Sequence, residues 1–238
     1  MTEKHISEDN NIKVQSMFDG IAFRYDFLNR FFSFGIDKIW RAKAVNELRA
    51  FMPEKVLDVA TGTADMAIAL QKKLNNAHIT GVDISEKMLA IGKQKVKKKG
   101  LEQHIKLEYG NSEALPFDQQ SFDAVTVAFG VRNFENLKNG LDEMYRVLKT
   151  GGKVIIIELS IPQQLVAQYI FKLYFFRILP YMGRFLSKHA YAYSYLPHSV
   201  QSFPYGAKFK EKMESCGFSE VGYKSLTFGI AHLYKGNK

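Results

Sequence analysis

A short apolar run that ends in a glycine-bearing turn constrains the fold of this chain more than any other feature. The segment reads Val56-Leu-Asp-Val-Ala-Thr-Gly-Thr-Ala-Asp65, and after a helical stretch a second apolar run ends in Asp83. In a parallel α/β sheet such a turn lets the backbone approach a ligand closely, and the later carboxylate can accept hydrogen bonds from ribose hydroxyls. The pattern therefore predicts a pocket for a ribose-bearing ligand at the edge of a parallel sheet.

Alternating apolar runs and helical patterns extend this prediction along the chain. Strands are predicted at 55–59, 78–82, 106–109, 124–128 and 153–158, with helices starting near Asp65, Glu86 and Leu137. Gly151 and Gly152 predict a turn before the last central strand. A helix near 207–216 and apolar runs at 220–225 and 227–234 predict a closing antiparallel strand pair. The expected architecture is α/β, with a mostly parallel sheet and right-handed crossovers.

Two helical additions accompany the predicted sheet. Residues 12–50 carry apolar side chains at helical spacing and are expected to form N-terminal helices, with Tyr25 and Asp26 in a lid over the ligand. Residues 161–205 are rich in aromatic side chains and interrupt the strand–helix rhythm, which predicts a helical insertion before the last strands. Because no linker or repeat separates these parts, residues 1–238 are expected to form a single domain.

The details of the turn favour S-adenosylmethionine over a dinucleotide as the ligand. A dinucleotide-binding turn needs the spacing G-x-G-x-x-G to seat a pyrophosphate, and here only Gly62 is present. S-adenosylmethionine has no pyrophosphate, and its amino-acid end carries an ammonium and a carboxylate. A Rossmann dehydrogenase is therefore disfavoured.

Each predicted cofactor contact has its own role. Asp58 is expected to hold the ammonium directly or through water, Gly62 and Thr63 to receive the methionine end, and Asp83 to bind the ribose hydroxyls. Asn111 and Ser112, just past the third strand, are expected to contact the adenine edge. Helix capping or a plain turn are the alternative roles of Asp58, Asp83 and Asn111.

Composition narrows the partners and the setting. The single cysteine excludes an internal disulfide and a multi-cysteine metal site, and no metal-binding pattern is present. No apolar run of about 18 residues could span a bilayer, so we expect a soluble, cytoplasmic protein. The net charge of +9 favours an anionic partner, either a nucleic acid or a lipid surface. The lysine cluster at 93–99 is expected to be a solvated helix face.

Several longer motifs resemble the menaquinone and ubiquinone C-methyltransferase family. The most specific is Phe129-Gly-Val-Arg-Asn133, and the likeness runs from about Met17 to about Phe218. It includes the segments 17–26, 33–40, 115–123, 144–148, 177–180, 193–196 and 202–204. The resemblance implies a class I S-adenosylmethionine-dependent methyltransferase that methylates a ring carbon of a polyprenylated hydroquinone. It also implies cofactor contacts by Thr63, Asp83, Asn111 and Ser112.

The chemistry of this reaction suggests roles for two residues of that motif. A ring carbon becomes nucleophilic when an adjacent hydroxyl loses its proton or is strongly polarised, and the sulfonium methyl needs mainly alignment. We expect Arg132 to stabilise the developing phenolate and Asn133 to orient the ring oxygen, since both follow the fourth strand at the sheet edge. A salt bridge or a helix cap is the alternative role of Arg132. His189 and His198 are expected to be packing residues rather than the base.

Two positions depart from the family pattern. Ala64 stands where glycine is usual, which is tolerable if its φ angle is negative. Ala128 stands where many members have serine, so no polar contact to the cofactor is assigned there.

The insertion and the charge suggest a peripheral membrane site. Residues 159–210 hold six Lys and Arg but no Asp or Glu, which suits an anionic lipid interface on the inner face of the membrane and an apolar channel for an isoprenoid tail. A helical cap with a core face is the alternative. Demethylmenaquinol is the favoured acceptor, with a benzoquinol as the alternative. An RNA methyltransferase and an inactive scaffold are disfavoured, no nucleic acid partner is expected, and the insertion could mediate a homodimer.

Overall fold

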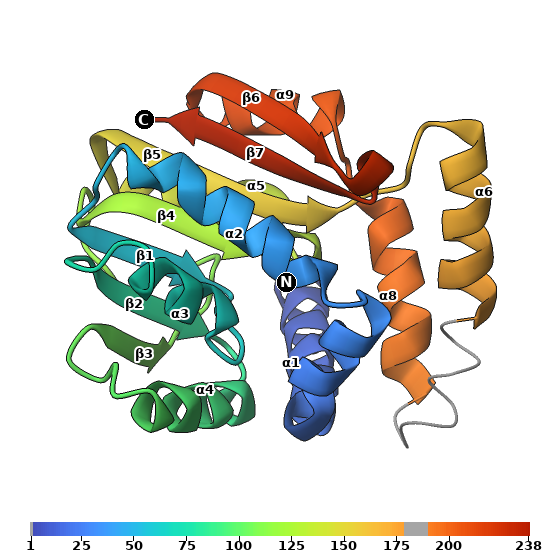
Figure 1. Ribbon diagram of the computed structural model, residues 1–238, viewed down its shortest axis with the longest axis horizontal. Coiled ribbons are helices and arrows are strands. Elements are labelled where there is room, and N and C mark those ends of the chain that lie inside the picture. Colours follow the sequence, from blue (N-terminus) through green and yellow to red (C-terminus); the bar gives the residue numbers. More distant parts are fainter. Residues whose placement is uncertain (1, 179–189) are drawn as a thin grey trace.

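A seven-stranded mixed sheet organises the protein, whose computed structural model describes residues 2–178 and 190–238 (Figure 1). The strand order is β3-β2-β1-β4-β5-β7-β6. The strands span β1 Lys55–Val59, β2 His78–Asp83, β3 Ile105–Tyr109, β4 Phe122–Ala128, β5 Leu148–Leu159, β6 Ser219–Leu226 and β7 Ala231–Asn237. The neighbours among β1 to β5 pair parallel, while β7 pairs antiparallel with both β5 and β6. The predicted fold class is confirmed.

Helices cover both faces of the sheet and bury two separate apolar layers. One layer packs α2 (Ile36–Arg49), α3 (Asp65–Gln71) and α4 (Glu86–Lys98) against the sheet, with Ala44, Leu48 and Leu70 fully buried. The other packs α5 (Leu137–Val147) and α9 (Ala207–Ser215) against the opposite face, with Leu141 and Phe209 fully buried. Strands covered on both faces read as continuous apolar runs, which is why the sequence marks β1 and β4 so clearly.

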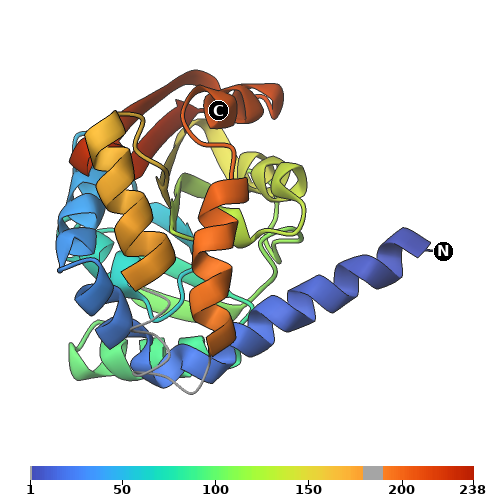
Figure 2. The same cartoon turned by 90° about the vertical axis from the view of Figure 1, so that its right-hand side faces the viewer.

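The carboxyl ends of the parallel strands face α1 (Thr2–Phe32) and α8 (Ala190–Ser202) (Figure 1). The first half of α1 projects from the rest of the protein, and its second half lies against the strand ends (Figure 2). A break at Phe34 and Gly35, both with positive φ, separates α1 from α2. The predicted N-terminal helical region is therefore two helices, and its first helix starts ten residues earlier than expected.

The insertion is helical in the parts that the structure describes. It comprises α6 (Leu165–Leu173), which continues into a π-helical turn at Tyr174–Ile178, and α8. Phe171 and Phe175 pack with Val200 of α8 in a small apolar cluster. His189 and part of the motif at 177–180 lie outside the described residues. No helix of the described chain is long and apolar enough to cross a membrane.

Two predicted strand boundaries are wrong. β5 starts at Leu148, so the expected turn at Gly151 and Gly152 lies inside the strand, where the register with β4 shifts. The run predicted from Thr227 begins with a 3₁₀ turn at Thr227–Gly229, and β7 starts only at Ala231. Backbone geometry explains the second case, because Thr227 and Phe228 both have positive φ and cannot continue a strand.

Candidate active site

The turn after β1 and the carboxylate after β2 are joined directly. The backbone N–H of Gly62 donates to Oδ2 of Asp83 at 2.8 Å, and the N–H of Ser85 donates to Oδ1 at 2.9 Å. Gly62 has φ of +55°, and the space beside its Cα is open, so a ligand can approach this backbone. The predicted neighbourhood of turn and carboxylate is therefore present.

Asp83 remains able to accept further hydrogen bonds. A carboxylate has about four lone-pair positions, and two backbone donors occupy half of them. Burial raises the pKa of the Asp83 carboxyl, and the two backbone N–H groups oppose this rise. A pair of ribose hydroxyls would supply donors of the kind that favours its ionised form.

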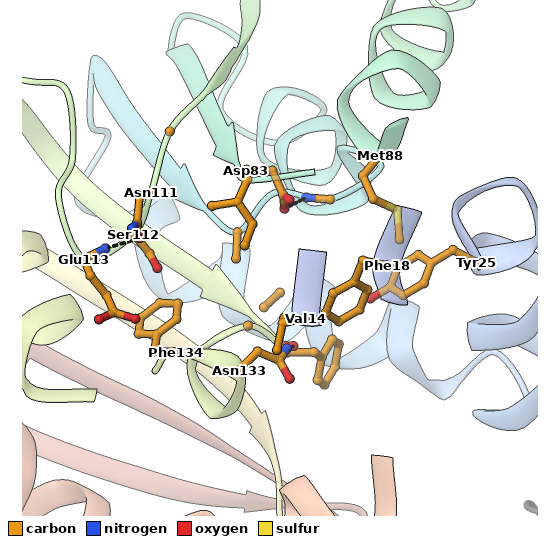
Figure 3. A pocket seen from close by; sticks show the side chains of 17 residues that line it. Val14, Phe18, Tyr25, Asp83, Met88, Asn111, Ser112, Glu113, Asn133 and Phe134 are labelled. Atoms are coloured by element: carbon orange, nitrogen blue, oxygen red, sulfur yellow. Dashed lines mark hydrogen bonds between the residues drawn. The ribbon is translucent and has the colours of Figure 1, made fainter. Parts of the chain in front are cut away.

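A small cavity lies in front of this carboxylate, and Figure 3 shows the side chains around it. Asn111 and Ser112 line it on one side, and Val14, Phe18 and Tyr25 of α1 line it on the other (Figure 3). The Asn111 carboxamide oxygen accepts from the N–H of Glu113 at 2.9 Å, which fixes the loop after β3. The structure thus brings together four predicted residues in one cavity, namely Gly62, Asp83, Asn111 and Ser112.

The other two predicted cofactor residues do not line this cavity. Asp58 is fully buried, where its carboxylate accepts from the hydroxyls of Thr61 at 2.6 Å and Thr126 at 2.9 Å. The Thr63 hydroxyl is also turned to another partner, since it donates to Oδ1 of Asp26 at 2.5 Å. Direct contact of either side chain with the cofactor is therefore not supported by this structure.

The two departures from the family pattern have different consequences. Ala64 has φ of +66° and is fully buried, so the condition of a negative φ is not met and the residue is strained. Ala128 lines the cofactor cavity with its methyl group, in agreement with the absence of a polar role.

Arg132 lies beside a buried acid that the sequence analysis did not single out. Its Nη1 donates at 2.6 Å both to Oε1 of Glu158 and to the backbone carbonyl of Phe129. The Glu158 side chain is fully buried and also accepts from the backbone N–H groups of Arg132 and Leu159. The alternative of a structural salt bridge is thus real for Arg132. A signal for Glu158 was available, because it ends a predicted strand at the same sheet edge.

A second, much larger cavity adjoins the first. It has a volume of about 680 Å³ and is walled mainly by apolar side chains of α1, α2, α6 and the loop before β7. Tyr25 and Phe129 line both cavities, and Arg132 lines only the large one. Asn133 lines the small one, where its side-chain oxygen accepts from the Tyr195 hydroxyl at 3.2 Å. Nothing in the sequence around Tyr195 indicates this contact.

Polar contacts hold α1 against the cofactor turn. Asp26 of α1 accepts from Thr63 and from Nζ of Lys95, the latter at 2.6 Å, and Lys95 also pairs with Asp65. Asp19 accepts from the hydroxyl of Ser85 at 2.5 Å. The expectation that all of the lysine cluster is solvated is wrong for Lys95, whose side chain is 20% exposed.

Other candidate groups lie away from both cavities. His198 is exposed on α8 and lines neither cavity. In the described part of the chain no cluster of three His, Cys, Asp or Glu side chains could hold a metal ion.

Known proteins share the whole of this arrangement. The demethylmenaquinone methyltransferase of Bacteroides fragilis is 47% identical over 95% of this chain and 92% of its own length. The ubiquinone/menaquinone biosynthesis C-methyltransferase of Geotalea daltonii is 44% identical over 95% of this chain and 96% of its own length.

Solved structures show the same fold at low sequence identity. A SAM-dependent methyltransferase of Aquifex aeolicus superposes with a TM-score of 0.56 at 18% identity, over 77% of this chain and 81% of that one. The model of the ubiE/COQ5 methyltransferase family matches residues 6–238. The resemblance drawn from the motifs is confirmed, and this chain belongs to the ubiE/COQ5 methyltransferase family.

Proposed function

We propose that this protein transfers a methyl group from S-adenosylmethionine to a ring carbon of a polyprenylated hydroquinone, with demethylmenaquinol as the favoured acceptor. The names of the relatives at 44–47% identity support this reaction. The observation that carries the proposal is the pair of adjoining cavities. A small cavity with polar groups at the strand ends meets a large apolar one at Tyr25 and Phe129.

The residues around the small cavity fit S-adenosylmethionine. Asp83 offers free lone pairs at the place where ribose hydroxyls are expected, and Asn111 and Ser112 lie across from it (Figure 3). Gly62 leaves its backbone open for the methionine end. When bound, S-adenosylmethionine supplies a sulfonium methyl group, and transfer forms a carbon–carbon bond, breaks the carbon–sulfur bond and releases the ring proton.

The residues between the cavities suit the acceptor ring. Arg132 can stabilise a phenolate that develops beside the reacting carbon, and Asn133 can orient the ring oxygen. Burial raises the pKa of Tyr25, so its phenol keeps its proton at neutral pH and serves as a hydrogen-bond donor rather than a base. The guanidinium of Arg132 is also no base, so proton removal falls to water or to another group.

An in vitro methylation assay with both ring types tests the function. We expect methyl transfer from labelled S-adenosylmethionine to prenylated 1,4-naphthohydroquinone, and slower transfer to the matching benzohydroquinone. Absence of transfer to either ring, with RNA methylated instead, would favour the RNA methyltransferase alternative. Cofactor binding without any methyl transfer would favour the scaffold.

We assign the second half of α1 as a lid over the cofactor. The small cavity has a volume of only about 70 Å³, whereas cavities that hold small-molecule ligands usually reach ~300–1,000 Å³. Val14, Phe18 and Tyr25 of α1 fill the difference from one side. The cofactor is therefore admitted only when α1 moves away from the strand ends.

The exposed face of α6 is the part of the insertion best suited to lie on a membrane. Leu165, Val166, Tyr169 and Ile170 are each at least 60% exposed. Lys172 and Arg177 are exposed nearby, and the sequence around them has no acid. Val166 and Ile170 also line the large cavity, so the exposed face is continuous with the space for an isoprenoid tail.

Vesicle flotation tests this surface. We expect binding to anionic vesicles and weaker binding to neutral ones, and we expect Leu165→Glu with Tyr169→Glu to abolish it. Tyr109→Glu is the matched control, because Tyr109 is exposed on β3 at the far end of the sheet (Figure 1). Equal loss in the control, or no flotation of the unaltered protein, would leave the α6 face as a contact between protein segments, including the homodimer expected from the sequence.

A further inference from the structure

The segment Ser33–Trp40 has no role in the proposed reaction, yet it places an ion pair in the wall of the large cavity. α2 starts at Ile36, which puts Asp37 and Arg41 four residues apart on its first turns. Arg41 pairs with Oδ2 of Asp37, while the Ser33 hydroxyl donates to Oδ1 at 2.8 Å. Both side chains are more than 90% buried. Such a pair costs desolvation energy that two apolar side chains would avoid, so it needs a reason at an apolar wall.

Arg41 keeps a hydrogen-bond donor unused. Its Nε is buried and has no hydrogen-bond partner among the described residues. Its guanidinium lies over the ring of Phe129, 5.2 Å from the centroid, and Arg41 and Phe129 both line the large cavity. Buried donors are nearly always satisfied, so an unpartnered one at a cavity wall points to an acceptor atom in a bound molecule.

Arg132 repeats this arrangement on the other side of Phe129. It is paired with one buried carboxylate, lines the same cavity, and has a buried Nε without a partner in the described chain. Both guanidinium charges also act on the Tyr25 phenol, where they oppose the rise of its pKa. Two donors of one kind therefore flank the place where the cavities meet.

We propose that Arg41 binds the second ring oxygen of the acceptor, the one remote from the methylated carbon, while Arg132 attends the oxygen beside it. This inference rests on the proposed function, because it requires an acceptor with two oxygens across one aromatic ring. Only the oxygen adjacent to the reacting carbon makes that carbon nucleophilic. The remote oxygen can only report how the ring is turned, so Arg41 is a binding and orienting residue that selects which ring edge faces the cofactor.

Paired with Asp37, Arg41 is suited to a neutral hydroxyl. The carboxylate balances the guanidinium charge, so the pair offers a strong donor without a net charge that would demand a phenolate. The proton of the remote hydroxyl can therefore stay in place during transfer, and no proton acceptor is required on the α2 side.

The test compares two acceptors that differ only in the remote oxygen. One is a prenylated 1,4-naphthohydroquinone, and the other is 3-prenyl-1-naphthol, which keeps only the hydroxyl beside the methylated carbon. Dissociation constants are measured with cofactor present, using Arg41→Met with Asp37→Asn so that no lone charge stays buried. We expect the double variant to bind the hydroquinone about tenfold or more weakly and the naphthol within twofold, since a hydrogen bond from a charged donor is of that size.

Two further variants keep the outcome readable. Arg146→Met with Glu143→Gln removes a helical Arg–Glu pair of α5 that does not line the cavity, and we expect it to leave both constants unchanged. Arg41→Lys keeps the charge but loses Nε, and we expect it to reduce the preference for the hydroquinone in the same direction if the double variant does not fold.

Equal weakening for both acceptors would mean that the Asp37–Arg41 pair only supports the fold, and no change for either would place Arg41 outside the site. Both results overturn the inference. They differ from failure of the proposed function, in which the unaltered protein neither binds nor methylates the hydroquinone.

Discussion

Arg132 donates from Nη1 to Oε1 of Glu158 at 2.6 Å, and both side chains are more than 90% buried. A sequence motif and the end of a neighbouring strand thus form one charged unit between two cavities. The pair couples the proposed chemistry to the stability of the fold, because removing either partner leaves the other as a lone buried charge. A test of Arg132 must therefore separate these two effects.

Replacing Arg132 with alanine should abolish methyl transfer and also lower the free energy of unfolding by about 3–5 kcal/mol, since Glu158 loses its partner. Arg132→Gln with Glu158→Gln should recover most of that stability while turnover stays low. In both variants the affinity for S-adenosylmethionine should stay within a few-fold, because Arg132 does not line the small cavity. Turnover, urea denaturation and calorimetric cofactor titration measure the three quantities. Near-normal turnover in the double variant would assign the pair a purely structural role.

Weakening the contact between α1 and α4 should speed cofactor exchange. Asp26→Asn removes the charge that Lys95 contacts at 2.6 Å, and a charged hydrogen bond of this kind contributes roughly 1.5–3 kcal/mol. We expect the cofactor to dissociate about tenfold faster in stopped-flow displacement. Lys106→Gln breaks an exposed ion pair with Glu108 on β3 and serves as the control, with no expected change. An unchanged rate in Asp26→Asn would show that this contact does not hold the lid.

Ala64 should tolerate glycine where an ordinary buried alanine does not. Relief of the left-handed strain at φ +66°, about 1–2 kcal/mol, should offset the lost methyl burial and the larger chain entropy of glycine. We expect Ala64→Gly to change the free energy of unfolding by less than about 1 kcal/mol. Ala44→Gly, in the middle of α2 and equally buried, should cost about 2 kcal/mol. Urea denaturation compares the two, and equal losses would argue against strain at Ala64.

The parts of the fold that the sequence predicted best are those with buried parallel strands. β1 has the predicted bounds, and β2 and β3 differ by one residue each, because strands covered on both faces are apolar throughout and end at polar turns. The start of β5 was missed because Leu148 and Lys149 also fit the end of a helix. The turn at Thr227 was missed because threonine and phenylalanine rarely adopt positive φ, so nothing in their identity predicts it.

The site shows the same division between local and tertiary information. Gly62, Asp83, Asn111 and Ser112 could be placed together because the ends of parallel strands share one edge. The direction of the Asp58 and Thr63 side chains could not, because it depends on partners from distant segments, such as Thr126 and Asp26.

The remaining prediction concerns the buried carboxyl of Asp58. Burial raises its pKa from 3.8 to about 6, although the hydroxyls of Thr61 and Thr126 donate to it. Because the folded pKa lies above the unfolded one, the stability associated with this group is complete below about pH 4 and is lost as the pH rises to 6. A difference of this size corresponds to about 3 kcal/mol.

Asp58→Asn removes this titration without removing the side-chain acceptor. Relative to the unaltered protein, the free energy of unfolding of Asp58→Asn should therefore rise by about 3 kcal/mol between pH 4 and pH 7, as measured by urea denaturation at each pH. Thr126→Val removes one hydroxyl that stabilises the ionised form at 2.9 Å, so its loss of stability should extend to higher pH. If the curves of Asp58→Asn and the unaltered protein run parallel, the Asp58 carboxyl titrates alike in both states, and the burial argument fails.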